Sequence, residues 1–277
     1  MSGADPGDRR PWQTEAGWQR LRRRMAVAEP VRRSRRGWLW LGAGAAAVLV
    51  GVVALVRLHG AATSTRAAVT HAGERLTVHL NDGSTVSLGP SSSIHYVEQR
   101  SGAEVALDGM AEFQVTHNPR RAFLVRARDA VIADIGTEFV VRGYSDDSLV
   151  RVAVRQGAVT LASKGAEGSA LQLRAGDAGG VTGGQARRLS SSDKETLLGF
   201  ANGSLVFDEE PLSRVALELS RWFNVDIQIL DSTLARRRVS ATYSAATLDD
   251  ILNALAVTSH FEFRRDGRKL VFRPGHP

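Results

Sequence analysis

One uncharged, apolar run limits the folds that this chain can adopt. Residues 37–56 read GWLWLGAGAAAVLVGVVALV and contain no charged side chain over 20 residues. An α-helix of that length extends about 30 Å, which is the thickness of the hydrocarbon core of a bilayer. We therefore expect a single membrane-spanning helix over residues 37–56. A buried helix of a soluble protein is the less favoured alternative, because such helices are seldom uncharged over so long a stretch.

The charges beside this run predict its orientation. Four arginines precede it and only Arg57 follows closely, and two tryptophans stand at the arginine-rich end: Arg32, Arg33, Arg35, Arg36, Trp38 and Trp40. Positive charge stays on the cytoplasmic side, and indole rings favour the membrane interface. We expect a protein of the cell inner (cytoplasmic) membrane with residues 1–36 in the cytoplasm and its bulk in the periplasm. A cleaved signal peptide and a twin-arginine export signal are the rival interpretations.

Most of the net charge lies in the N-terminal arm. Residues 1–36 contain ten arginines against four acidic residues, whereas residues 57–277 are nearly neutral. Within this arm, residues 12–25 show helical spacing, with arginines on one face and an apolar face formed by Trp12, Trp18, Leu21 and Met25. Such a basic amphipathic helix lies on anionic membrane lipid or docks in a groove of a partner. An arm without a stable helix is the alternative, because about 14 residues seldom form a lone helix.

The residues beyond the run divide into two further regions. Residues 57–70 are expected to be a linker, and residues 71–175 alternate apolar and polar side chains with turn residues every few positions. Two such runs, 76–80 and 85–88, flank Asn81-Asp82-Gly83-Ser84, which indicates a hairpin. The alternation predicts an all-β sandwich or roll of about ten short strands. A Gly/Ser-rich linker is expected over residues 176–196, because that composition is flexible.

Residues 197–277 have a mixed pattern. Helical spacing after Pro211 and after Thr247 alternates with short β runs, and Asp266-Gly267 indicates a final hairpin. The expected order is β-α-β-β-α-β-β. The predicted fold class is therefore a single-pass membrane protein with an all-β sandwich or roll, followed by a small α+β domain.

The sequence lacks the motifs of an exported enzyme. There is no cysteine, no pair of histidines at helical metal-ligand spacing, and no phosphate-binding loop, since the glycines at 179–184 are not followed by Lys-Ser/Thr. We expect no metal and no cofactor. We also expect no nucleic-acid partner, because the arginines at 236–238 lie in a nearly neutral region.

Four ordered stretches resemble the FecR domain. They are Leu80–Ser84, Leu107–Val115, Ala133–Arg142 and Val154–Val159, which correspond to the patterns L-x-D-G-S, L-x-G-x-A-x-F-x-V, G-T-x-F-x-V and V-x-x-G-x-V. The second region resembles the STN module found at the C-terminus of FecR-type proteins, on residues 205–212 and 248–255. The whole arrangement is similar to a FecR-type anti-sigma factor and transmembrane sensor.

This resemblance implies a signalling function. A regulator of this type relays a periplasmic signal from a TonB-dependent outer-membrane transporter, of the iron and siderophore uptake class, to an extracytoplasmic-function sigma factor. The arm would hold the sigma factor through Trp12, Trp18, Leu21 and Met25, although it is shorter than is usual in the family. The transporter's signalling domain would dock at the strand carrying Val225, Ile227 and Ile229, and membrane proteases would release the arm.

The resemblance also points to a bond that cleaves itself. In some FecR-like proteins the Gly-Thr bond, here Gly136–Thr137, is opened when the threonine hydroxyl attacks the preceding carbonyl carbon. A tight turn or bulge before the next strand is the alternative for these residues. For the whole chain, the alternative from another class is an envelope-anchored interaction scaffold that binds glycan or protein and has no sigma factor partner.

Overall fold

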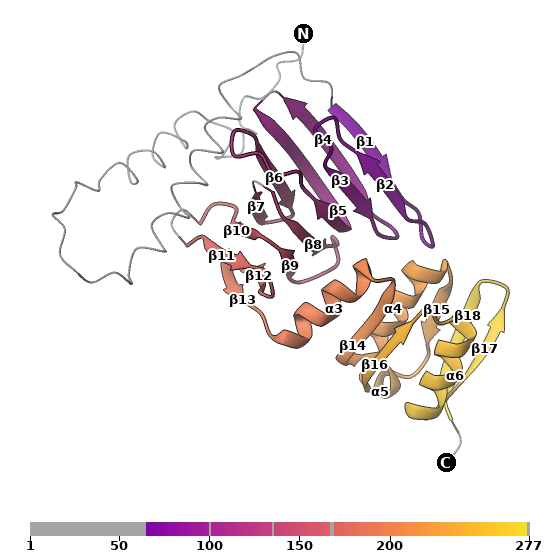
Figure 1. The fold of residues 1–277 in the computed structure, drawn as a ribbon. Helices are drawn as coiled ribbons and strands as arrows, with labels where there is room; N and C mark the ends of the chain where they lie inside the picture. Colours follow the sequence, from indigo (N-terminus) through magenta and orange to yellow (C-terminus); the bar gives the residue numbers. More distant parts are fainter. Residues whose placement is uncertain (1–64, 100, 135, 167–168, 276–277) are drawn as a thin grey trace, which may run out of the picture.

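The computed structural model describes residues 65–99, 101–134, 136–166 and 169–275, which form a β domain followed by a smaller α+β domain (Figure 1). The strands of the β domain are β1 (Thr65–Val69), β2 (Leu76–His79), β3 (Thr85–Leu88), β4 (Ser93–Gln99), β5 (Gly102–Gln114), β6 (Ala122–Ala127), β7 (Ala130–Asp134), β8 (Glu138–Gly143), β9 (Val150–Gln156), β10 (Ala158–Ser163), β11 (Leu171–Arg174), β12 (Ala178–Thr182) and β13 (Gln185–Arg188).

Two layers of the β domain share strand β5. One layer has the order β1-β4-β5-β6-β7-β10-β11, and the other has the order β2-β3-β5-β8-β9-β12-β13. The first half of β5 pairs with β4 and β6, and its second half pairs with β3 and β8. Gly109 marks the change, with a φ of 116°. A Cβ there would lie 2.3 Å from the Ser92 hydroxyl, so only glycine fits this crossing.

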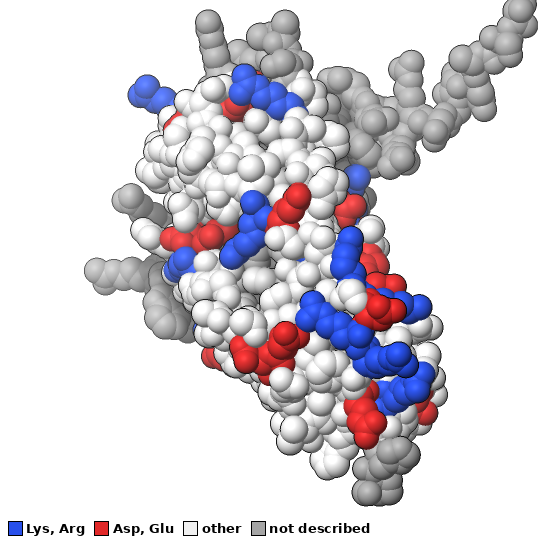
Figure 2. Space-filling view, turned by 90° about the vertical axis from the view of Figure 1, so that its right-hand side faces the viewer, with Lys and Arg blue, Asp and Glu red and all other residues white. Residues whose placement is uncertain are grey.

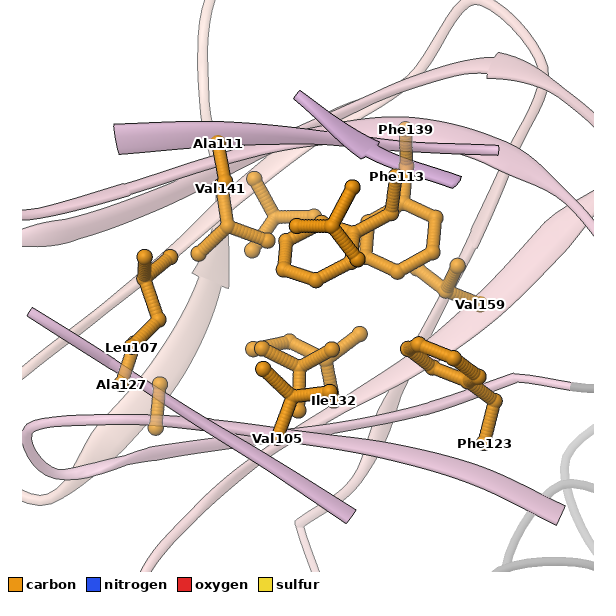
Figure 3. Close-up of a cluster of buried hydrophobic side chains, with 14 of the residues drawn as sticks. Val105, Leu107, Ala111, Phe113, Phe123, Ala127, Ile132, Phe139, Val141 and Val159 are labelled. Carbon is orange, nitrogen blue, oxygen red and sulfur yellow. The ribbon is translucent and has the colours of Figure 1, made fainter. Parts of the chain in front are cut away.

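The core of the β domain lies between the two layers (Figure 3). Phe113 of β5 stacks on Phe139 of β8 with ring centroids 5.0 Å apart, and Phe123 of β6 meets Phe113 edge-on at 6.0 Å. Alternate residues of these strands point inward, as the period of two requires. The intervening residues of β8, Val140 and Arg142, therefore lie on the outer face of their sheet.

The predicted linker over residues 176–196 is wrong. Strand β12 pairs with β9 and with β13, so residues 178–188 complete a layer of the β domain. The glycines there serve close packing, since a Cβ on Gly179 would lie 2.8 Å from Leu173 Cδ1. The predicted linker over residues 57–70 also ends early, because β1 occupies Thr65–Val69.

The second domain follows helix α3 (Ser191–Ala201). Its elements are β14 (Ser204–Pro211), α4 (Leu212–Phe223), β15 (Asp226–Ile229), α5 (Ser232–Ala235), β16 (Arg238–Ser244), α6 (Leu248–Thr258), β17 (Phe261–Asp266) and β18 (Lys269–Pro274). Strands β14 and β16 pair with each other, and β15-β18-β17 form a separate three-stranded sheet. Helix α6 begins with a capping box between Thr247 and Asp250. The predicted strand and helix order is thus found, with the short α5 added.

The predicted fold class requires correction. The described residues are mostly β, with few helices, and none of those helices is long and apolar enough to cross a membrane. Helix α4, with 12 residues, reaches only about 18 Å against the roughly 30 Å of a hydrocarbon core. The run at residues 37–56, on which the single-pass prediction rested, lies outside the described residues.

Candidate functional site

The two domains meet in a junction on the outer face of the β8–β9–β12 layer. Its centre is apolar: Leu197 and Phe200 of α3 pack with a cluster of outward-facing β-domain residues, namely Met110, Val140, Tyr144, Ala153 and Ala178. Trp222 of α4 meets the Phe200 ring edge-on, with centroids 6.0 Å apart. Helix α3 therefore links the domains by contacting the sheet on one side and β14 on the other.

A buried ionic network forms one rim of this junction. The Arg142 guanidinium of β8 donates from Nε to Asp147 Oδ2 at 2.9 Å, and its Nη2 lies 2.9 Å from Glu218 Oε2 of α4. The Asp147 side chain is fully buried and also accepts from Arg214 of α4 at 3.2 Å. Helix α4 is thus held to the β domain through two carboxylates that share Arg142.

Arg221 of α4 extends the same rim. Its Nη2 donates to Asp146 Oδ1 at 2.6 Å, and its guanidinium lies 3.9 Å above the centre of the Tyr144 ring. The Tyr144 hydroxyl donates in turn to the carbonyl of Pro90 at 2.8 Å. The cation–π contact and the ion pair together hold the end of α4 against the loop between β8 and β9.

These contacts decide the ionisation of the buried groups. Burial opposes ionisation of Glu218, but Arg142, Arg221 and the Trp222 indole outweigh it and lower the pKa of this carboxyl. Burial likewise opposes ionisation of Asp147, and Arg142 and Arg214 lower its pKa. Burial, together with the nearby Glu218 charge, raises the pKa of Tyr144 to about 12. Both carboxylates are therefore charged at neutral pH and Tyr144 keeps its proton.

At the opposite rim of the junction, two carboxylates share a single arginine. Glu112 of β5 and Glu138 of β8 share Arg155, whose Nη1 lies 3.2 Å from Glu112 Oε1 and 2.7 Å from Glu138 Oε1. Burial raises the pKa of Glu112; Arg155 opposes this effect, and the Glu138 charge reinforces it. Arg155 also donates to the side chain of Asn202, which follows α3. The two rims therefore respond to pH in opposite directions.

The residues predicted to cleave themselves lie just before β8. Gly136 has a φ of 142°, and a Cβ there would lie 2.4 Å from His117 Cα. Thr137 is buried, and its Oγ1 has no hydrogen-bond partner among the described residues. Its carbonyl accepts from the amide of Val115 at 2.9 Å, which holds the backbone in place. This bond therefore joins a glycine in a backbone conformation that other residues rarely adopt to a threonine hydroxyl that has no partner among the described residues.

The residues predicted to contact a transporter point inward. Val225 belongs to the core of the second domain, and Ile227 and Ile229 pack against that core. On β15 the exposed side chains are Asp226 and Gln228, and Leu230 just beyond it is 54% exposed. Strand β15 pairs only with β18 among the described residues, so its other backbone edge is open. That edge, and not the three predicted side chains, is the accessible feature.

The predicted sigma-binding residues, Trp12, Trp18, Leu21 and Met25, lie outside the described residues. The junction was not predicted. The ion pairs between the two domains join residues 67 to 76 positions apart, as Arg214 and Asp147 or Glu218 and Arg142 show, so no local spacing predicts them. The only signal in the sequence was the placement of Arg142 at an outward position of a strand whose neighbours are apolar.

Comparisons with known proteins match both domains. Residues 66–160 match the family model described as FecR protein, and residues 204–272 match the model described as FecR, C-terminal. No curated protein sequence matches the chain. Two crystal structures of a provisionally assigned anti-sigma factor from Parabacteroides distasonis ATCC 8503 are similar, each with a TM-score of 0.68 and 24% identity. They cover 76% and 77% of this chain and all of their own. At that identity the likeness shows the shared fold.

The fold and the junction define a two-domain protein whose domains match FecR models in chain order, over more than half of the sequence. The chain belongs to the FecR family, which confirms its resemblance to FecR-type proteins. The second domain matches the C-terminal FecR model, so its resemblance to the STN module stays a prediction.

Proposed function

We propose that this FecR-type protein is an anti-sigma regulator that relays a signal from a TonB-dependent outer-membrane transporter to an extracytoplasmic-function sigma factor. The observation that carries the proposal is the order of the two FecR matches on two domains joined by one junction. The basic arm at residues 1–36 would hold the sigma factor. The protein would work at the cytoplasmic membrane with both described domains in the periplasm, and membrane proteases would end the relay.

The sigma partner is tested with the full chain and with a chain that lacks residues 1–36. We expect an extracytoplasmic-function sigma factor to be retained by the full chain and not by the shortened chain. Replacement of Trp12 and Trp18 by alanine should weaken that retention. Equal retention by both chains would exclude the arm as the binding segment. If neither chain retains a sigma factor, the regulator proposal fails in favour of an interaction scaffold. Cell fractionation tests the proposed location.

The transporter contact is proposed at the open edge of β15. An edge strand offers unpaired backbone groups to an added strand, and exposed side chains beside it provide selectivity. Both signs of charge are mixed over the face of the second domain seen in Figure 2, which favours a partner of mixed charge.

Two exposed apolar residues of the second domain provide a matched pair for this contact. Leu230 follows β15, and Val257 lies on α6 and is 76% exposed. We expect Leu230→Asp to weaken binding of the transporter's signalling domain at least about tenfold, because a charge replaces an apolar contact. Val257→Asp should leave that binding unchanged. Equal weakening by both substitutions, or by neither, would place the contact elsewhere.

We also propose a single self-cleavage at Gly136–Thr137, supported by the φ of 142° at Gly136 and by the buried Thr137 Oγ1, which has no hydrogen-bond partner in the part of the chain that the structure describes. The Thr137 hydroxyl would add to the Gly136 carbonyl carbon, forming the C–O bond as the C–N bond breaks, and the hydroxyl proton would pass to the departing amine. Water would then hydrolyse the ester, giving a Gly136 carboxylate and restoring the Thr137 hydroxyl. Positioning of the hydroxyl beside the carbonyl would supply most of the acceleration.

Mass spectrometry of the purified full chain tests this cleavage. We expect two products, one ending at Gly136 and one beginning at Thr137. Thr137→Val keeps the shape but removes the hydroxyl and should stay intact, whereas Thr137→Ser keeps the hydroxyl and should still cleave. An intact wild-type chain, or cleavage of the valine variant, would refute the proposal.

A further inference from the structure

The loop between β1 and β2, residues 70–75, contacts the second domain directly. The amide of Gly73 donates to the carbonyl of Arg221 in α4 at 2.7 Å. The Arg75 guanidinium donates to the carbonyl of Phe200 at 2.9 Å and lies 4.7 Å above the Phe200 ring. A Cβ on Gly73 would lie 3.2 Å from Asn224 Cβ, so the loop and the end of α4 approach closely. The second domain therefore supports a segment of the β domain.

A second route joins α4 to the same segment through the β domain. Arg221 lies on the Tyr144 ring, and the Tyr144 hydroxyl donates to the Pro90 carbonyl. Two residues further on, Ser92 accepts from the Thr70 hydroxyl at 3.1 Å and donates its amide back to it at 3.0 Å. Thr70 directly follows β1. Arg221 therefore contacts the loop directly at Gly73. Through Tyr144 it also contacts the segment after Pro90, which binds Thr70 at the end of β1.

Within the β domain, β1 is an edge strand. Among the described residues, β1 pairs only with β4, over five residue pairs. Its side chains are largely exposed, Val69 by 57%, and only Ala68 packs against the core. Edge strands with few buried contacts open with low free energies. A hollow lined by residues from 69–72, Asp146 and Arg221 lies beside the ion pair, so the pair is reachable from solvent.

We propose that the junction is a latch: while Arg142 and Arg221 hold α4, residues 65–76 stay ordered, and when these ion pairs open, that segment loosens and becomes accessible to proteases. The segment begins directly after residues 57–64, which follow the uncharged run in the sequence. Displacement of the second domain is therefore converted into exposure of the chain next to residues 57–64. The coupling is reciprocal, so loosening β1 also weakens the attachment of α4. This inference deepens the proposed relay and rests on it for its role in signalling, whereas the coupling itself is measurable without a transporter.

Hydrogen exchange of the full-length chain tests the latch. Glu218→Gln and Asp146→Asn each remove a junction charge, and both should speed amide exchange of residues 65–76 at least about tenfold. Exchange within β5 should stay unchanged, because the β-domain core is untouched. The matched control is Asp249→Asn, which removes the exposed ion pair between Asp249 and Arg265 and should leave residues 65–76 at the wild-type rate.

Two results would overturn the latch. The first is wild-type exchange of residues 65–76 in both junction variants. The second is a uniform rise over β1 and β5, which signifies global destabilisation without specific coupling. Failure of transporter or sigma binding with the exchange pattern intact would refute the proposed function and leave the coupling standing.

A disulfide lock provides a second measurement, since the natural chain has no cysteine. Gly73→Cys combined with Asn224→Cys joins the loop to the end of α4. Oxidation should slow exchange of residues 65–76 relative to the reduced form of the same variant, even with Glu218→Gln present. Equal exchange in the oxidised and reduced forms would contradict the latch. Strain from the cysteine at Gly73, whose φ is 79°, is present in both forms and cancels.

Discussion

The interior of the β domain and the junction lie on opposite faces of the same strand, β8, and they are stabilised differently. Its inward residues Phe139 and Val141 are fully buried in an apolar core, whereas its outward Arg142 lies between Asp147 and Glu218. Apolar burial is favourable without directional requirements, but buried charges are favourable only when each partner is in place. The β domain is thus a permanent unit, and attachment of the second domain is conditional on a few contacts.

The largest expected effect comes from the apolar face. Phe139→Ala removes a ring that stacks on Phe113, and cavity formation should lower the free energy of unfolding by about 3–5 kcal/mol. Urea unfolding followed by circular dichroism measures this loss. A loss below that of Arg142→Met would contradict the division between a permanent core and a conditional junction.

Arg142→Met tests the polar face of the same strand. The substitution keeps an apolar stem but leaves Asp147 and Glu218 with fewer cations, so we expect a loss of about 3 kcal/mol at pH 7. The folded pKa values of both carboxyls are lowered from 3.8 and 4.5. Their contribution is therefore present above those values and is lost as the pH falls through the folded values. The variant and the wild type should converge in acid, and a constant difference would show that packing dominates.

The rim at Glu112 should respond in the opposite way. Burial raises the folded pKa of this group above 4.5, so its contribution to stability is present below 4.5 and is lost as the pH rises through the folded value. Glu112→Gln removes the charge and should raise the unfolding free energy at pH 7 by about 1 kcal/mol. Thermal unfolding at pH 4 and pH 7 checks this sign. Destabilisation at pH 7 would mean that the Arg155 ion pair outweighs burial.

The smallest effect should come from an ion pair outside both regions. Asp249 and Arg265 pair at 2.8 Å on the surface of the second domain, with side chains 68% and 44% exposed. Because solvent screens such pairs, Asp249→Asn should change the unfolding free energy by less than about 0.5 kcal/mol. A larger change in urea unfolding would indicate that burial does not explain why the junction ion pairs contribute more to stability than surface pairs do.

Local features of the fold could be predicted from the sequence. Strands β2 and β3 form the expected hairpin around residues 81–84, and Thr247 caps α6 as its spacing indicated. Helix α3 begins after a capping box that joins Ser190 to Asp193. Such signals are readable because their partners are only three or four residues apart.

Features that depend on distant partners could not be predicted. Glycine at positions 179 and 180 has the composition of a linker, and only the neighbouring Leu173 and Leu149 side chains explain why strands are found there. The inward direction of Val225, Ile227 and Ile229 is a different case and could have been predicted. Alternation places these apolar residues on the core face and Asp226 and Gln228 outside. The ionic network could not be predicted, since its members come together only after both domains have folded.

Because both layers contain β5, the order in which the strands are synthesised limits when each layer can fold. Its four neighbours are β3 and β4, which precede it, and β6 and β8, which follow it, with β8 ending at Gly143. A nascent chain that has emerged only as far as Gln114 therefore presents a long strand with two flanks uncovered. Strand β6 is complete at Ala127 but β8 only at Gly143, so both flanks of β5 are covered only after about thirty further residues leave the ribosome, and a stall in that interval exposes apolar surface that is prone to aggregation.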